Sequence, residues 1–138
     1  MAVQWILAFA LAIDLAGVKS EPNLEKRSDR ALDYANSALD AARDAYGRGE
    51  FEPFQAQLNE VSASVDIAYE ALEQTGKDPR RNPRAFKRAE MRTRELLRRI
   101  EGLVQAVNYA DREAVEKVQE RVAGVHDNLL EGIMSKRK

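Results

Sequence analysis

The sequence predicts an all-α protein: an antiparallel four-helix bundle built from two helical hairpins, with an apolar N-terminal segment before it. Two observations support this fold class. Apolar and small residues recur at alternating steps of four and three through four segments, and helix-breaking residues separate those segments. Such a repeat places a stripe along one side of an α-helix, which must be buried against other helices. A strand needs alternation with a period of two, which no segment shows.

The first twenty residues differ in composition from the rest, and we expect them to be an export signal. The run Met1–Ile13 is uncharged and mostly apolar. Its length is that of the hydrophobic core of a signal peptide and is too short to span a membrane. Small residues at 10–12 or 18–20 suit cleavage. No basic residue precedes the run and Asp14 ends it, so the alternative is an apolar N-terminal helix packed on the bundle.

Residues 21–138 are expected to form a single helical-bundle domain, since the chain has only 138 residues. The repeats run from Leu24 to Ala45, from Phe51 to Leu72, from Phe86 to Val107 and from Val115 to Leu129. Breaks fall at residues 21–23, 47–49, 76–83 and 108–111, where glycine, proline or a capping residue occurs. The short second and fourth breaks predict that each pair of helices is an antiparallel hairpin.

Capping residues agree with these breaks. Asn82 can cap a helix that has Pro83 at its first position, and Asp111 can cap the last helix. Alanines fill the repeat positions of the first helix from Ala31 to Ala45, so we expect a neighbouring helix to approach it closely.

Five stretches resemble a family of small, predicted-exported bacterial proteins without an assigned activity. They are residues 21–28, 64–69, 76–90, 94–99 and 126–134. The resemblance implies an α-helical fold and export to the periplasm or cell envelope; a cytoplasmic location is the alternative. It implies no activity, and no transmembrane span is expected in the mature chain.

Residue types exclude several kinds of chemistry. The chain has no cysteine and one histidine, His126, and it lacks the motifs of hydrolases, metalloproteases and nucleotide-binding enzymes. Asp29, Asp33, Asp40 and Asp44 lie near one helix face and could in principle bind a hard cation. We interpret them as a solvated acidic face, because no turn arranges their oxygens. We therefore predict no enzymatic activity, no cofactor and no metal.

Charge is distributed very unevenly along the chain. Residues 21–76 hold 12 acidic and 5 basic residues, whereas residues 77–99 hold 10 basic and 3 acidic ones, although the whole chain has a net charge of −1. At 100° per residue, the basic residues of the third helix cluster opposite its apolar repeat and face outwards. The candidate residues for binding an anion or a partner are Arg80, Arg81, Arg84, Lys87, Arg88 and Arg98.

The sequence favours a non-enzymatic, exported helical bundle that acts as a binding or scaffold module for an acidic protein or another anionic partner. One alternative is a structural or homo-oligomerising bundle in which residues 77–99 pair with the acidic first hairpin. Another is weak binding of polyanions or nucleic acid through residues 77–99, which the acidic pI of 5.9 speaks against. The position of residues 29–44 relative to residues 84–99 distinguishes the binding module from the structural bundle.

Overall fold

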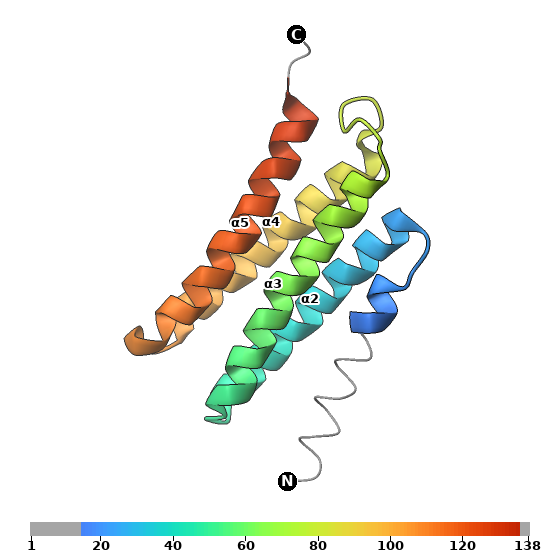
Figure 1. Ribbon diagram of the computed structural model, residues 1–138. Coiled ribbons are helices and arrows are strands. Elements are labelled where there is room, and N and C mark those ends of the chain that lie inside the picture. Colours follow the sequence, from blue (N-terminus) through green and yellow to red (C-terminus); the bar gives the residue numbers. More distant parts are fainter. Residues whose placement is uncertain (1–14, 136–138) are drawn as a thin grey trace.

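The computed structural model describes residues 15–135, and all the regular structure in this part of the chain is helical (Figure 1). A short helical stretch at residues 15–19 precedes four long helices. The elements are α2 (Leu24–Gly47), α3 (Phe51–Gln74), α4 (Pro83–Ala106), the 3₁₀ helix η1 (Tyr109–Asp111) and α5 (Arg112–Met134). The predicted all-α class and the four helices are confirmed.

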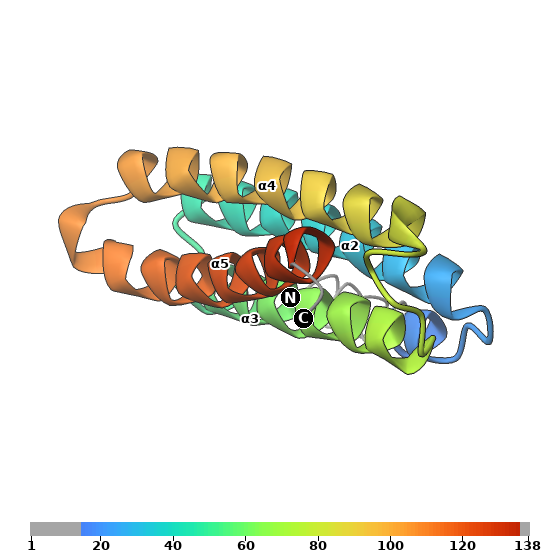
Figure 2. The ribbon, with the colours of Figure 1, turned by 90° about the horizontal axis from the view of Figure 1, so that it is seen from above.

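The two hairpins lie side by side, with α4 beside α2 and α5 beside α3 (Figure 2). Within each hairpin the helices are antiparallel, but neighbours from different hairpins run parallel. Asp29 contacts Arg88, Asp33 contacts Arg92 and Asp40 contacts Arg99, and 59 residues separate the members of each pair. Residues 75–82 cross one end of the bundle diagonally, from the end of α3 to the start of α4 beside α2.

Two glycines take backbone conformations that other residues rarely adopt. Gly49 has a φ of 73° in the turn between α2 and α3, and Gly76 has a φ of 69° just after α3. Because a Cβ atom disfavours this left-handed region, glycine is suited to ending both helices. The first turn is therefore short enough to fold α3 back on α2.

The core consists of the four predicted stripes. Their members are buried, except Leu24 and Phe51 at the N-terminal ends of their helices. Along α2 the buried positions from Ala31 to Ala45 are mostly alanine, and α2 packs most extensively against α3. The small side chains allow the close approach that the sequence predicts, and larger residues such as Phe54 and Leu58 of α3 fill the space opposite.

The N-terminal segment contributes to this core. Residues 1–14, which carry most of the predicted export signal, lie outside the described residues, but Val18 is only 8% exposed and Leu15 packs against the core. Arg27 Nε donates to the carbonyl oxygen of Glu21 at 2.8 Å, which fixes the turn into α2. Between residues 15 and 135, no helix has the length and apolar character needed to cross a membrane.

Candidate functional site: the basic face of α4

The basic residues of segment 77–99 divide into three groups in the structure. One group reaches across to α2, a second pairs within its own loop or helix, and a third is exposed and forms no ion pair with the described residues. The division follows position around α4, because residues toward α2 meet the acidic face of that helix and residues on the outer side meet solvent.

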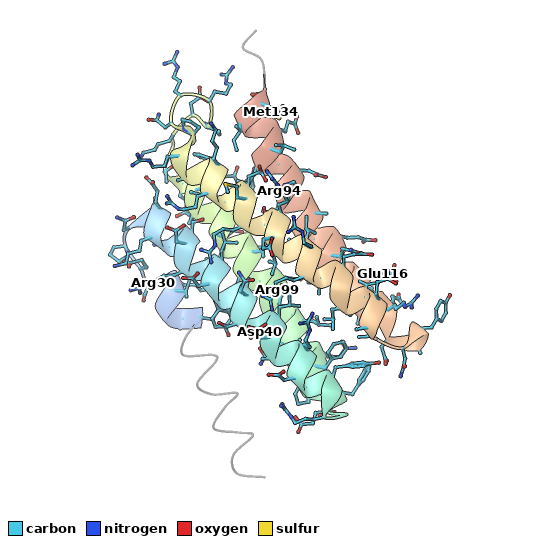
Figure 3. The ribbon with its side chains drawn as sticks, turned by 180° about the vertical axis from the view of Figure 1, so that it is seen from behind. Arg30, Asp40, Arg94, Arg99, Glu116 and Met134 are labelled. Carbon is cyan, nitrogen blue, oxygen red and sulfur yellow. The ribbon has the colours of Figure 1, made fainter. Side chains whose placement is uncertain are left out.

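The first group forms a row of ion pairs between α2 and α4, which we call the α2–α4 ladder. Arg88 Nε lies 3.0 Å from Asp29 Oδ1, Arg92 contacts the Asp33 carboxylate, and Arg99 contacts that of Asp40, as the labels in Figure 3 show for the last pair. The predicted acidic face of α2 is therefore a partner for arginines.

Two further contacts strengthen this row, one within it and one beyond its Asp29 end. Arg99 Nη1 donates to Asn36 Oδ1 at 2.6 Å, and Lys77 Nζ lies 2.7 Å from Glu25 Oε2. The Lys77 ammonium holds the pKa of Glu25 below its ordinary value, mainly by this hydrogen bond. The acidic first hairpin and the basic segment thus meet within one chain.

Two of the predicted binding residues are consequently engaged elsewhere. Arg88 belongs to the α2–α4 ladder, and Arg80 pairs with Asp78 inside the loop before α4 at 3.4 Å. The backbone N–H of Arg80 also donates to Asp78 and lowers the pKa of that carboxyl. Arg80 and Arg88 thus have ionic partners within the chain, and their binding of an external partner stays a prediction.

The remaining candidates are exposed. Arg81, Arg84 and Lys87 have no hydrogen bond or ion pair to another residue within 15–135 through their side chains. Arg98 contacts Glu95 at 3.1 Å, with 74% of the arginine side chain exposed. We define the outer face of α4 by its exposed residues at alternating spacings of three and four: Arg84, Lys87, Met91, Arg94 and Arg98.

This outer face can bind extended anions. Guanidinium groups donate in pairs to carboxylates and phosphates. The side chains of Arg94 and Arg98 are more than half exposed, and Arg84 is exposed and forms no ion pair with the described residues. The larger hollows of the described residues lie between α3 and α5, at the hairpin turns, and beside residues 76–79, where Phe86 of α4 lines one of them. None of these hollows is lined by a residue of the outer face. The face is therefore convex, which suits a partner with an extended surface.

A buried carboxylate lies beside the outer face, toward α5. Glu90 is 7% exposed, accepts from Arg94, and has Oε2 at 3.0 Å from His126 Nε2 of α5. The hydrogen bond from Arg94 is the main cause that lowers the pKa of Glu90, and the His126 contact acts in the same direction. His126 thus connects α5 to α4 through Glu90. The described residues contain no group of three or more carboxylates or histidines that could hold a metal.

The sequence contains a signal for the α2–α4 ladder that the predictions above do not use. Acidic residues at 29, 33 and 40 and basic residues at 88, 92 and 99 have the same internal spacings of four and seven. Such matched spacings predict pairing between two parallel helices. The prediction of antiparallel hairpins alone did not indicate that α2 and α4 are parallel neighbours.

Comparisons of the chain with protein-family models, with curated proteins and with solved structures found no match. We therefore infer the biochemical role from the geometry of residues 15–135.

Proposed function

We propose that the chain is a non-enzymatic helical binding module that contacts an anionic partner through Arg81 and the outer face of α4. One observation carries the proposal. Within a single basic segment, the cations that face α2 are matched to carboxylates, whereas Arg81, Arg84 and Lys87 are exposed and form no ion pair among residues 15–135. Arg84 and Arg81 act on carboxylates only at longer range, where they help to lower the pKa of Glu25 and of Asp78.

A purely structural role accounts for only part of the charge distribution. It explains Arg88, Arg92 and Arg99, because their carboxylate partners lie on α2. It gives no reason for Arg81, or for Arg84 and Lys87 of the outer face, which are exposed and form no ion pair among residues 15–135. We also place this module outside the cytoplasm, because the apolar run in residues 1–13 and the family resemblance both favour export.

Heparin, a flexible polyanion, tests the proposal. We expect the wild type to bind a heparin column at low salt and to elute as salt screens the charges. The triple variant Arg81→Gln, Arg84→Gln, Lys87→Gln should not be retained. Glutamine preserves helix propensity and the three side chains are exposed, so the circular dichroism spectrum and melting temperature should stay those of the wild type.

A control variant removes the same charge from other places on the surface: Arg43→Gln, Arg48→Gln, Lys117→Gln. These three side chains are exposed and none belongs to α4; Arg43 approaches α4 at Gly102, beyond the C-terminal end of the outer face. The control should elute with the wild type. Equal loss of retention in both triple variants would refute the proposed site, and a wild type that heparin does not retain at low salt would favour the purely structural bundle.

A further inference from the structure

We infer that the partner of the outer face of α4 is an anionic lipid surface, so that the protein binds membranes from outside without crossing them. This inference rests on the proposed function and assigns a partner to the same face. Four features of the described residues lead to it: the shape of the face, the acidic residues on its flanks, Met91 at its centre and the acidic helix on the opposite side.

The shape of the outer face is a straight row on a convex surface. Its residues follow one another at spacings of three and four, so their side chains lie one above another along the helix. From Arg84 to Arg98 the row is about 21 Å long at the helical rise of 1.5 Å per residue. A convex row of this kind touches a plane along its whole length, whereas it offers no enclosed site for a small anion.

Carboxylates flank the row on both neighbouring helices. Asp33 and Asp40 of α2, although paired with Arg92 and Arg99, have side chains 71% and 64% exposed. Glu116 and Asp127 of α5 are exposed, and Figure 3 labels Asp40 and Glu116 on the two sides of α4. A DNA groove encloses an inserted helix from both sides, so it would bring phosphates toward these carboxylates. A flat surface meets the outermost cations and leaves the flanking acids farther away. The flanks therefore favour a plane over a nucleic-acid groove.

Met91 lies in the middle of the cationic row and is 62% exposed. A bilayer interface takes up an apolar side chain among its headgroups while the arginine and lysine stems extend their charges to the phosphates. A highly charged polyanion has no comparable apolar region to cover this side chain. The combination of four cations with a central methionine therefore fits lipid better than a polyanion.

The acidic side of the molecule points away from a surface that α4 contacts. α3 lies diagonally across the bundle from α4, and its residues Glu52, Glu70 and Glu73 are exposed. With a net charge of −1 the chain as a whole is not attracted to an anionic membrane. Attraction thus comes from the few cations of α4, while repulsion of α3 orients the bundle, so binding should depend strongly on single residues of the outer face.

The experiment is co-sedimentation of the full chain with vesicles. One set contains phosphatidylcholine alone, and the other contains phosphatidylcholine and phosphatidylglycerol in equal parts. We expect binding to the anionic vesicles at low salt, weaker binding at physiological salt, and no salt-dependent binding to the neutral vesicles. The apolar residues 1–13 are present in every variant, so any binding that they cause cancels in the comparison.

Variants identify the residues responsible. Each cation near an anionic surface strengthens binding about fivefold, so Arg84→Gln, Lys87→Gln, Arg98→Gln should weaken it roughly a hundredfold. The control Arg43→Gln, Arg48→Gln, Lys117→Gln should bind like the wild type. Met91→Ser should weaken binding a fewfold and Met91→Leu should preserve it. Circular dichroism shows that each variant is folded.

The outcomes separate this inference from the proposed function. Retention on heparin through the outer face without binding to anionic vesicles would overturn the lipid inference and leave the proposed function intact. A wild type that binds neither heparin nor the anionic vesicles would refute both the proposed function and the lipid inference. Tighter binding to a short DNA duplex than to the anionic vesicles, or equal weakening in the two triple variants, would likewise refute the lipid inference.

Discussion

Among the buried polar side chains of the described residues, Ser28 has no hydrogen-bond partner, and the others are satisfied in two different ways. Ser64 and Thr93 donate to carbonyl oxygens of their own helices, at 2.7 Å to Glu60 and 2.9 Å to Ala89. Glu90 instead connects two helices, because its carboxylate accepts from Arg94 of α4 and contacts His126 of α5. A serine or threonine that bonds within its helix stabilises no particular neighbour, whereas the Glu90 contact specifies how α4 and α5 are placed.

Replacing Glu90 by glutamine should therefore make stability less dependent on pH. The pKa of Glu90 is lowered from its ordinary 4.5, so its charge stabilises the folded state above that pH, and this stabilisation is lost as the pH falls through the lowered folded-state pKa. At about pH 7 we expect Glu90→Gln to be less stable than the wild type by about 1–3 kcal/mol. Urea unfolding at pH 7 and at about pH 3 measures both differences. A difference that does not shrink at the lower pH would contradict this role.

At the residue scale, the sequence predicts which side chains are buried better than it predicts their hydrogen bonds. The repeat positions identify the core because the period of the helix determines which residues share a face. Asn82 and Asp111 occupy the predicted cap positions, but neither side chain makes a capping hydrogen bond. Asp111 accepts from the Tyr46 hydroxyl at 2.8 Å, and Tyr46 is 65 residues away in sequence. A contact of that range depends on how the hairpins are placed, which local spacing does not encode.

At the scale of elements, the α2–α4 ladder shows how two parallel helices are kept in register. Its three ion pairs share one sequence separation, so sliding either helix by one turn would break all of them together. Across the bundle, Arg121 of α5 makes a paired contact with Asp66 of α3 at 2.7 and 2.9 Å. Ionic contacts on both sides thus align the hairpins, while apolar burial supplies most of the stability.

Removing the acidic side of the ladder should destabilise the bundle modestly. Exposed ion pairs contribute about 0.2–1 kcal/mol each, so Asp29→Asn, Asp33→Asn, Asp40→Asn should lower the free energy of unfolding by roughly 1–2 kcal/mol at low salt. High salt should reduce the loss, because it screens the pairs in the wild type. Urea unfolding at two salt concentrations measures it.

A matched variant distinguishes pairing from net charge. Asp44→Asn, Glu52→Gln, Glu116→Gln removes three exposed carboxylates that form no ion pair within the described residues. It should retain wild-type stability. If it were destabilised as much as the ladder variant, the ladder would contribute nothing beyond the general charge balance.

At the scale of the whole molecule, the fold decides how much of the charge asymmetry remains available for binding. The sequence shows the asymmetry between residues 21–76 and 77–99, and it shows that the basic residues lie away from the apolar repeat. It does not show that α2 lies beside α4, because two stacked hairpins can be arranged with either helix of one hairpin beside either helix of the other. This arrangement engages Arg88, Arg92 and Arg99 and leaves the outer face of α4 exposed.

The core also bears on the predicted export signal, since Val18 is 8% exposed and Leu15 packs beside it. Cleavage after Ser20 would remove both residues, whereas cleavage after Ala12 would keep them. Full burial of a valine contributes about 1.5–3 kcal/mol, and a change of 1 kcal/mol shifts the melting temperature of a domain of this size by roughly 4 °C. A chain that starts at residue 13 should therefore melt several degrees above one that starts at residue 21, and we expect the exported protein to begin at residue 13. Amino-terminal sequencing of protein from the native host identifies the first residue of the exported chain. Thermal melts of the two truncated chains measure the difference in melting temperature. Retention of Met1 or Ala2 in the cytoplasm would overturn export, and equal melting temperatures would show that Val18 does not stabilise the bundle.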